Sequence, residues 1–463
     1  MKILLIHPSI SGIGFNSFGI DQEGTWIHHG LCLISAYAKE KGYSIDLIDL
    51  RNLKGWKNFR QEIITKKPDV VGITMMSPDY DYAIKCIDIV KGVNKHIKTV
   101  VGGPHPSIMT EEVNTNQNID YVITGEGEIS FSGLLHNIEN NIPSPKIIYG
   151  ITPDLEKIPY ADRELYGHLE TPIVDILPAP FVTIIAGRGC IYNCKFCQPA
   201  ERKIFGKKVR RRSVDNVIKE LTILKETYSF KSMLIHDDCL TEDKNWVLEF
   251  CEKYKLEGFK EPFVCQARVN HIVKNRDVIA KLKDTGLKML IIGFESGSQK
   301  ILNFLNKGST VEQNYEAAKI CKELNILVWA NYMLGIPTET KEEIMQTVKM
   351  IREIKPYHSS PAFFTPHPGS DLFDYCVKND LSLIKNHSDY RRSPGKAKIK
   401  GVDYNFLNKA LALSLYEKTD FLSIFIKKII YTTYLQTIKN KIKKYKAGKK
   451  IISLFKQILK DKE

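Results

Sequence analysis

The chain has 463 residues, of which 43% are hydrophobic and 26% are charged. These proportions exclude a wholly disordered chain, because enough apolar side chains are present to build a core. At roughly 150 residues per domain, the length suggests about three domains, or two larger ones. No apolar run approaches the ~18 residues that a membrane span needs, and the apolar stretch at 3–6 is too short for the core of a signal peptide. We therefore expect a cytoplasmic protein.

The positive charge is concentrated at the C-terminal end. The formal net charge is +14, and residues 427–463 carry +10 of it, from 12 Lys and 2 acidic residues. A nucleic-acid enzyme usually spreads its basic residues over one face of its body, so we expect no nucleic-acid partner. The tail also repeats Ile, Leu, Phe and Tyr at helical spacing, which predicts a basic amphipathic helix pair. Two roles stay open for it: peripheral contact with an anionic membrane surface, and packing on the protein with the lysines in solvent.

The first 150 residues alternate short apolar runs with amphipathic segments. This alternation predicts five strands in a parallel, doubly wound sheet. The strands are expected at 3–6, 45–50, 70–74, 99–101 and 121–124. Ligands of such sheets bind beyond the carboxyl ends of the strands, where this chain places Ser77, Gly102-Gly103 and Gly125-Glu126-Gly127. Either a large planar ligand or a phosphate approaches the backbone there, or these segments are simply tight turns.

A second series of strands and helices follows an irregular, proline-containing linker at 151–180. Helical patterns separate its apolar runs, so the series predicts a full or partial β/α barrel over residues 181–380. Its strands are expected at 181–186, 232–236, 262–267, 289–294, 328–334 and 359–365. Residues 381–463 are expected to form a mostly helical C-terminal region that ends in the basic tail.

Three of the ten cysteines are clustered: Cys190, Cys194 and Cys197 lie within eight residues, directly after the strand expected at 181–186. A structural zinc site needs four protein ligands, usually in two separated pairs, and the sequence offers no second pair. Three soft thiolates suit a [4Fe–4S] cluster with one open iron, which favours a catalytic site over a structural one. The seven scattered cysteines are expected to be reduced, buried small hydrophobes.

The Cys-x3-Cys-x2-Cys spacing resembles the radical S-adenosylmethionine (SAM) superfamily. In that family the open iron binds SAM, and one electron from a reductant such as flavodoxin or ferredoxin cleaves SAM to methionine and a 5′-deoxyadenosyl radical. The resemblance covers roughly residues 180–375 and implies that Phe196 lies near the adenine. It implies further SAM contacts at Asp237, Arg268, Glu295, Ser296 and Gly335. For Asp237, a solvated strand end is an equally open alternative.

An α/β domain ahead of such a core resembles the cobalamin-binding class of radical SAM enzymes. The segments at 100–106 (VVGGPHP) and 121–128 (YVITGEGE) carry this resemblance, together with the linker at 158–163. It implies a Rossmann-like cobalamin-binding domain at 1–150, followed by a linker at 151–180 and the radical SAM barrel. The implied cobalamin contacts are Thr74, Met75, Met76, Ser77, Gly102, Gly103, His105, Gly125, Glu126 and Gly127. Many cobalamin proteins place Asp-x-His-x-x-Gly after the first strand; here Pro8 follows His7 and the Asp is missing, so we expect His7 not to ligate cobalt.

The resemblance implies a methyltransferase that uses a [4Fe–4S] cluster, SAM and cobalamin to methylate an unactivated carbon. A small-molecule or lipid substrate is expected between the two cofactors. Relatives that close or rearrange rings, or couple carbons, form an alternative that nothing in the sequence separates from methylation. An RNA methylthiotransferase is disfavoured, because residues 1–150 hold only Cys32 and Cys86 where that class needs three further cluster ligands.

Two further segments have open roles. Trp26, His28 and His29 precede the first predicted helix, where they either meet the substrate or, as we favour, pack the loop. Three consecutive arginines, Arg210, Arg211 and Arg212, follow the cysteine cluster. They either bind an anionic substrate group or lie in a solvated connection.

Overall fold

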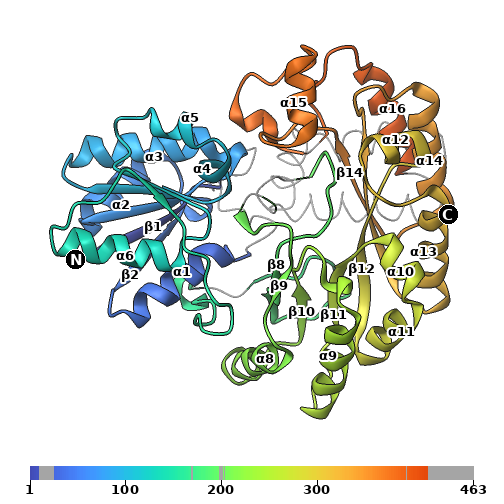
Figure 1. The fold of residues 1–463 in the computed structure, drawn as a ribbon, viewed down its shortest axis with the longest axis horizontal. Coiled ribbons are helices and arrows are strands. Elements are labelled where there is room, and N and C mark those ends of the chain that lie inside the picture. Colours follow the sequence, from blue (N-terminus) through green and yellow to red (C-terminus); the bar gives the residue numbers. More distant parts are fainter. Residues whose placement is uncertain (10–25, 168–169, 198–201, 203, 393, 416–463) are drawn as a thin grey trace, which may run out of the picture.

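The computed structural model describes residues 1–9, 26–167, 170–197, 202, 204–392 and 394–415. Two six-stranded sheets organise this part of the chain, the first from the N-terminal third and the second from the middle and C-terminal part (Figure 1). The basic tail predicted at 427–463 lies outside the described residues. None of the described helices is both long and apolar enough to cross a membrane.

The first sheet is parallel, in the order β2-β1-β3-β4-β5-β6. Its strands are β1 (Ile3–His7), β2 (Ile45–Asp49), β3 (Val70–Thr74), β4 (Lys98–Gly102), β5 (Tyr121–Thr124) and β6 (Ile147–Tyr149). The sequence predicted the first five. The sixth was missed because it has three residues, none of them fully buried, at the sheet edge.

Helices cover both faces of this sheet, as the alternating pattern predicts. One apolar cluster joins the sheet to α1 (His29–Glu40) and α6 (Glu128–Glu139), and another joins it to α2 (Trp56–Lys66) and α3 (Tyr80–Val93). Short helical turns complete the region: η1 (Leu50–Asn52), η2 (Ser77–Asp79), α4 (Pro104–Ile108), α5 (Thr110–Asn114) and, in the linker, η3 (Arg163–Tyr166).

The second sheet is also parallel, in the order β14-β13-β12-β11-β10-β7. It comprises β7 (Phe181–Ile184), β10 (Ser232–Ile235), β11 (Phe263–Ala267), β12 (Leu287–Glu295), β13 (Leu327–Leu334) and β14 (His358–Phe363). The sheet is curved, and β7 and β14 are not paired with each other in the described structure. The predicted β/α barrel is therefore a partial one.

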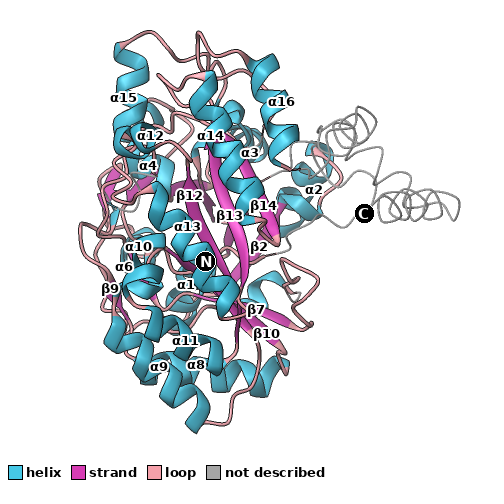
Figure 2. Cartoon of the chain, turned by 90° about the vertical axis from the view of Figure 1, so that its right-hand side faces the viewer, coloured by secondary structure: helices cyan, strands magenta, loops and turns pink. Residues whose placement is uncertain are grey.

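Helices cover the outer face of the curved sheet, and Figure 2 shows α13 and α14 in front of its strands. These outer helices are α8 (Val214–Tyr228), α9 (Lys244–Leu256), α10 (Val269–Lys274), α11 (Arg276–Thr285), α12 (Gln299–Phe304), α13 (Val311–Glu323) and α14 (Lys341–Ile354). Reciprocal capping boxes start two of them, Thr310 with Gln313 and Thr340 with Glu343, and satisfy backbone N–H groups that a helix start leaves unpaired. The ribbon of β8 (Gly187–Arg188) and β9 (Arg210–Arg211) flanks the cysteine loop, and η4 (Leu240–Glu242) follows β10.

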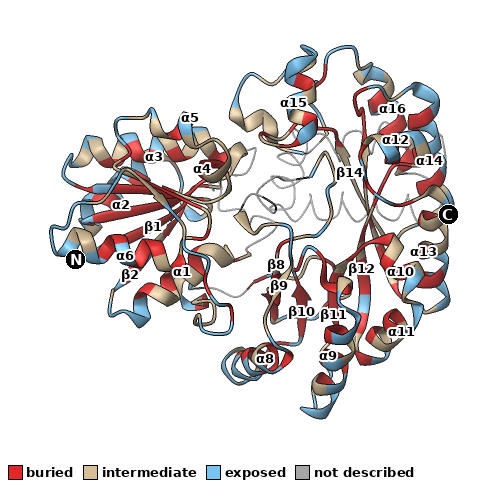
Figure 3. Cartoon of the chain, viewed as in Figure 1, coloured by how far each residue is buried: buried red, intermediate tan, exposed pale blue. Residues whose placement is uncertain are grey.

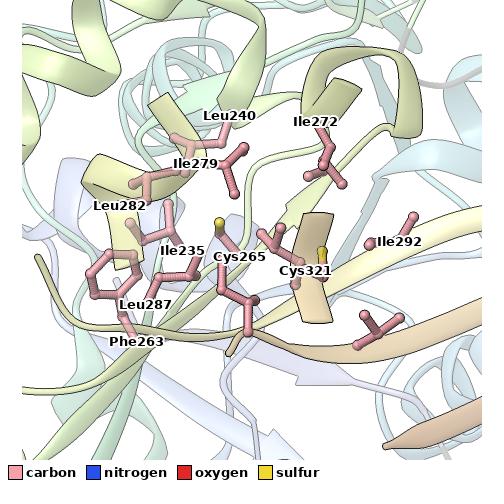
Figure 4. Close-up of a cluster of buried hydrophobic side chains, with 14 of the residues drawn as sticks. Ile235, Leu240, Phe263, Cys265, Ile272, Ile279, Leu282, Leu287, Ile292 and Cys321 are labelled. Atoms are coloured by element: carbon pink, nitrogen blue, oxygen red, sulfur yellow. The ribbon is translucent and has the colours of Figure 1, made fainter. Parts of the chain in front are cut away.

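The largest apolar cluster fills the space between the curved sheet and its helices, where Figure 3 shows the strands and the inward helix faces buried. Cys265 and Cys321 lie there among aliphatic side chains such as Ile279 and Leu282 (Figure 4). All seven scattered cysteines are buried, as predicted. Burial raises the pKa of Cys321 to about 12, so this thiol stays protonated and inert.

The described part of the C-terminal region is less helical than expected. After α15 (Asp371–Lys378) the described residues are irregular up to α16 (Tyr404–Ser414), apart from the short turn η5 (His387–Tyr390) and an isolated bridge between Ser382 and Ile399. Leu407 and Leu411 of α16 then join the core beside α14.

Candidate active site

A cavity of about 1270 Å³ lies between the two sheets. It is larger than the roughly 300–1,000 Å³ that is usual for a ligand site, so it can hold more than one small molecule. The carboxyl ends of strands from both sheets line it, through Thr74 and Gly102 of the first sheet and Ala267 and Glu295 of the second. This is the position that parallel sheets use for ligands.

The three clustered cysteines line this cavity together. They follow Gly189, whose φ is +99° and where a Cβ atom would lie 2.6 Å from the carbonyl oxygen of Lys208, so that only glycine fits. The second half of the loop is tied to the segment after α12, because the Lys195 amide donates a hydrogen bond of 2.9 Å to the carbonyl oxygen of Leu305. The turn therefore presents its thiols to the space between the sheets.

Cationic groups surround the thiols. Arg268 donates to Cys194 Sγ at 3.4 Å, and its guanidinium lies 3.5 Å from the centre of the Tyr192 ring. A hydrogen bond with the Cys239 thiol lowers the pKa of Cys190 below its ordinary value, against the opposing effect of burial. Desolvation by the surrounding protein instead raises the pKa of Cys197 to about 12, so the surroundings favour the iron-binding thiolate form at Cys190 but not at Cys197. Three cysteine side chains that face one cavity fit a [4Fe–4S] cluster with an open iron.

Three of the six residues predicted to contact SAM line the cavity: Phe196, Arg268 and Glu295. Glu295 ends β12 with a positive φ of 60°, and its carboxylate accepts a hydrogen bond of 2.7 Å from Lys307 Nζ. Lys307 also lines the cavity and was missed by the sequence analysis. A carboxylate and two cations beside the cysteines match the charges of an amino-acid group such as the methionine part of SAM.

The other three, Asp237, Ser296 and Gly335, lie outside the described lining of the cavity. The Asp237 carboxylate accepts hydrogen bonds from the Ala186 amide at 2.7 Å and from Arg211 at 3.1 Å. Ser296 is fully buried and contacts Thr347 of α14. Gly335 faces α16, where an added Cβ would lie 2.6 Å from Leu407. Their observed contacts join parts of the protein scaffold.

Six of the ten predicted cobalamin contacts line the cavity: Thr74, Gly102, Gly103, Gly125, Glu126 and Gly127. Gly103 has a φ of +102°, and a Cβ atom there would lie 3.0 Å from Thr74 Oγ1. A Cβ at Gly127 would lie 3.2 Å from Ile34. The rim of this sheet is therefore bare backbone at two successive strand ends, which fits a large planar ligand that must approach closely.

Met75, Met76, Ser77 and His105 are not among the described cavity-lining residues. Met75 is fully buried in the same apolar cluster as Ile73, because alternate residues of a strand face the same side of the sheet. Ser77 instead contacts His105, whose Nδ1 lies 3.1 Å from the serine hydroxyl.

The histidines near the first sheet have separate roles. His7 is buried, contacts the Tyr166 hydroxyl at 3.0 Å and lies outside the described cavity lining. His28 and His29 do line the cavity, although packing was favoured for both. Trp26 packs against Phe181 instead.

His28 combines packing with its place in the cavity. Its Nδ1 accepts a hydrogen bond from the Leu31 amide at 3.2 Å and thereby caps α1. Burial lowers its pKa to about 4, so the ring is neutral at neutral pH and carries its proton on Nε2. That proton faces Thr74 Oγ1 at 3.4 Å. A protonated Nε2 is not a metal ligand, so His28 forms part of the cavity wall.

The arginines after the cysteine loop are paired within the protein, which differs from both roles considered for them. Arg210 binds Glu126, Arg211 binds Asp237, and Arg212 binds Glu220 at 2.5 Å. Arg188, two residues before the first cysteine, binds both Glu126 and Glu128. The ion pairs of Arg188 and Arg210 connect the segments that flank the cysteine loop directly to the glycine-rich loop of the first sheet.

Replacing Gly103 by valine is expected to prevent corrin binding and to lower the free energy of unfolding by about 1–3 kcal/mol, because the side chain is strained at positive φ and collides with Thr74. Corrin absorbance after gel filtration and a urea titration measure both effects. Gly133→Ala is the matched control, since open space surrounds that helical position. Equal corrin content in Gly103→Val and in the unmodified protein would contradict the inference that the ligand needs bare backbone at this strand end.

Two family models match the chain. The B12 binding domain matches residues 19–135, and the radical SAM superfamily matches residues 184–351. Their order agrees with the two halves of the cavity. The chain belongs to the cobalamin-binding radical SAM enzymes. Its cofactors are accordingly cobalamin, a [4Fe–4S] cluster and SAM.

Curated relatives of this radical SAM enzyme include methyltransferases and cyclases. An uncharacterized methyltransferase of Pyrococcus horikoshii is 29% identical over 426 residues, which cover 89% of this chain and 91% of the relative. The anaerobic magnesium-protoporphyrin IX monomethyl ester cyclase of Rubrivivax gelatinosus is 29% identical over 395 residues, covering 81% of this chain and 69% of the relative.

The fold also matches a solved structure. The cobalamin-dependent S-adenosylmethionine radical enzyme OxsB, with aqua-cobalamin and S-adenosylmethionine bound, superimposes with a TM-score of 0.68. The match covers 99% of this chain and 75% of OxsB at 15% sequence identity, so it supports the architecture alone.

Proposed function

We propose that this radical SAM enzyme is a methyltransferase that adds a methyl group to an unactivated carbon of a small-molecule substrate. The observation that carries the proposal is that one cavity is lined by the cysteine loop from one side and by the glycine-rich strand ends from the other. When bound, the cluster with SAM supplies a hydrogen-abstracting radical, and the corrin supplies the methyl group. A substrate between them would meet both groups without leaving the cavity.

Each side of the cavity has a defined part in this proposal. Cys190, Cys194 and Cys197 hold the cluster, and Arg268 and Glu295 orient SAM beside it. Residues 1–150 form the cobalamin-binding part and 181–380 the radical SAM core, joined by the linker at 151–180. The ion pairs of Arg188 with Glu126 and Glu128 hold the two parts in register, so that the substrate carbon stays between the cofactors.

The substrate class is a small molecule, and a one-electron reductant such as flavodoxin or ferredoxin would supply the electron. The described cavity walls offer both polar and apolar groups, for example Asn331 and Met333 of β13 and Phe363 of β14. A lipid substrate with peripheral membrane contact is the narrower hypothesis. It depends on the basic tail within residues 416–463, which lie outside the described part.

Cyclisation is the second candidate function, and the cyclase of Rubrivivax gelatinosus supports it at 29% identity. The same cavity would serve it, because a substrate radical formed beside the cysteine loop could also close a ring. The two functions differ in the fate of the SAM methyl group. Methyl transfer moves that group to the product, whereas ring closure leaves it on methionine.

SAM with a deuterated methyl group separates the two functions. The reduced, cobalamin-loaded enzyme is incubated with the labelled SAM and with small-molecule and lipid extracts of the producing cells. The proposal predicts intact CD3 in the corrin fraction and in a product detected by mass spectrometry, with methyl transfer lost in Cys194→Ala. A product that forms together with 5′-deoxyadenosine but carries no deuterated methyl group would contradict methylation and favour the cyclase.

A further inference from the structure

A cluster of metal-ligand side chains lies away from the cavity, where the first sheet meets the C-terminal region. His105 of α4, Glu112 of α5 and His387 of η5 each offer one ligand atom, and these three atoms all lie within 4.8 Å of one another. The cluster joins residues 275 positions apart in the chain. The cavity-based function uses none of the three.

One of the two ligand distances fits a small shared cation. Glu112 Oε2 lies 3.4 Å from His105 Nε2, and Glu112 Oε1 lies 2.9 Å from His387 Nε2. In a tetrahedral zinc site with bonds of about 2.0–2.2 Å, neighbouring ligand atoms are about 3.3–3.5 Å apart. The distance from His105 matches this spacing, and the distance from His387 to the other oxygen of the carboxylate is about 0.5 Å shorter, at hydrogen-bond length.

A neighbouring side chain contacts the Nδ1 atom of each imidazole ring and so orients the ring. His105 Nδ1 contacts Ser77 Oγ at 3.1 Å, and His387 Nδ1 lies 3.3 Å from Asp81 Oδ1. Ligand histidines almost always use their second nitrogen in this way, which fixes the ring and leaves the first nitrogen for the metal. The ring of Tyr80 also packs against the cluster, because it stacks on His387 with ring centres 4.0 Å apart.

One of the candidate ligand atoms lacks a hydrogen-bond partner among the described residues. His105 is fully buried, and its Nε2 has no hydrogen-bond partner among the described residues, although it faces Glu112. A buried polar nitrogen without a partner destabilises the fold, and a cation between this nitrogen and the carboxylate would remove that cost.

We propose that His105, Glu112 and His387 bind a divalent transition metal ion, zinc, which fastens the C-terminal region to the cobalamin-binding part. Two imidazoles and one carboxylate form a ligand set that zinc accepts, with a fourth position for water. The site gives His105 a role other than the cobalamin contact predicted from the sequence. A polar network, in which His387 contacts Asp81 and Glu112 without a metal ion, is the competing explanation for the same contacts.

Zinc binding to the anaerobic holoenzyme tests the proposal. The cluster and the corrin are loaded first, so that the cysteine thiolates are occupied, and Zn²⁺ is titrated against a chromophoric zinc chelator. We expect about one zinc per chain in the unmodified enzyme and in His96→Ala, which alters an exposed histidine elsewhere. His387→Ala and Glu112→Gln should each bind zinc at least about tenfold more weakly, and Asp81→Asn about 10–100-fold more weakly.

Iron content, corrin content and circular dichroism of each variant confirm that it is folded. Zinc K-edge X-ray absorption should show nitrogen and oxygen ligands at about 2.0–2.2 Å. Three results would each overturn the proposal. These are no zinc binding by the unmodified enzyme, zinc binding by that enzyme with the same affinity as by the ligand variants, and a spectrum that shows sulfur ligands at about 2.3 Å. The first of these outcomes would favour the polar network.

Discussion

Cys194→Ala is expected to abolish binding of the [4Fe–4S] cluster and to lower the rate of 5′-deoxyadenosine formation at least about a thousandfold. The variant leaves two thiolates where the cluster needs three, and Arg268 then faces no sulfur. Iron and sulfide analysis, with the visible absorbance of the cluster, measure the first effect. Chromatography of 5′-deoxyadenosine under reducing conditions measures the second.

Cys239→Ala is the matched control, because this buried thiol lies beside Cys190 but belongs to the strand-end segment after β10. It should keep about four irons per chain. Loss of its hydrogen bond should lower the reduction potential of the cluster, since hydrogen bonds to the sulfurs stabilise the reduced form. Equal iron loss in both variants would show that the cluster uses a fourth cysteine, contrary to the open-iron site.

Arg188→Ala is expected to lower the free energy of unfolding by about 3–5 kcal/mol and to weaken corrin binding. The Arg188 side chain is 11% exposed, and those of Glu126 and Glu128 are 3% and 5% exposed. Removing the guanidinium leaves Glu128 without the cation that offsets its burial, while Glu126 keeps Arg210. A urea titration and corrin absorbance measure the two effects.

The control for this variant is Lys244→Ala, which removes an exposed ion pair with Asp277. Exposed pairs contribute about 0–1 kcal/mol, so stability and corrin content should change little. If the two variants were equally stable, the contacts of Arg188 would not hold the two sheets together.

The strands β1, β3, β7 and β10 were predictable because they are buried on both faces, and such strands appear in the sequence as continuous apolar runs. Both parallel sheets followed from the alternation of these runs with helical patterns. The three-residue β6 escaped prediction because its apolar run, Ile147–Tyr149, is too short to indicate a strand by itself. The irregular segment before α16 could not be predicted from a local pattern, because its structure depends on contacts between distant residues, such as that of Lys398 with Thr365.

The site was predictable where backbone or local spacing determines it. The three cysteines and the glycines at the strand ends line the cavity because their positions follow from the strands before them. The positions of Asp237 and Met75 outside the cavity lining could have been predicted from the alternation of side chains along a strand. Ile73 and Met75 face one apolar cluster, and Asp237 turns inward while Asp238 lines the cavity.

Long-range pairing was beyond the sequence analysis. Arg188 with Glu126, Lys307 with Glu295, and the cluster of His105 with His387 each join segments whose contact depends on how whole elements pack. No local pattern marks these partners, because a charged residue on a loop has many possible counterparts. The structure was needed to show that the cysteine loop and the glycine-rich loop are joined by buried ion pairs.

The central claim is that one cavity holds both cofactors, and the most direct measurement is the content of iron, sulfide and corrin in one anaerobically purified sample supplied with cobalamin. We predict about four irons, about four sulfides and about one corrin per chain. Iron and sulfide without corrin would contradict the claim, because the glycine-rich half of the cavity would then hold another ligand and the proposed methyl transfer would lose its methyl donor.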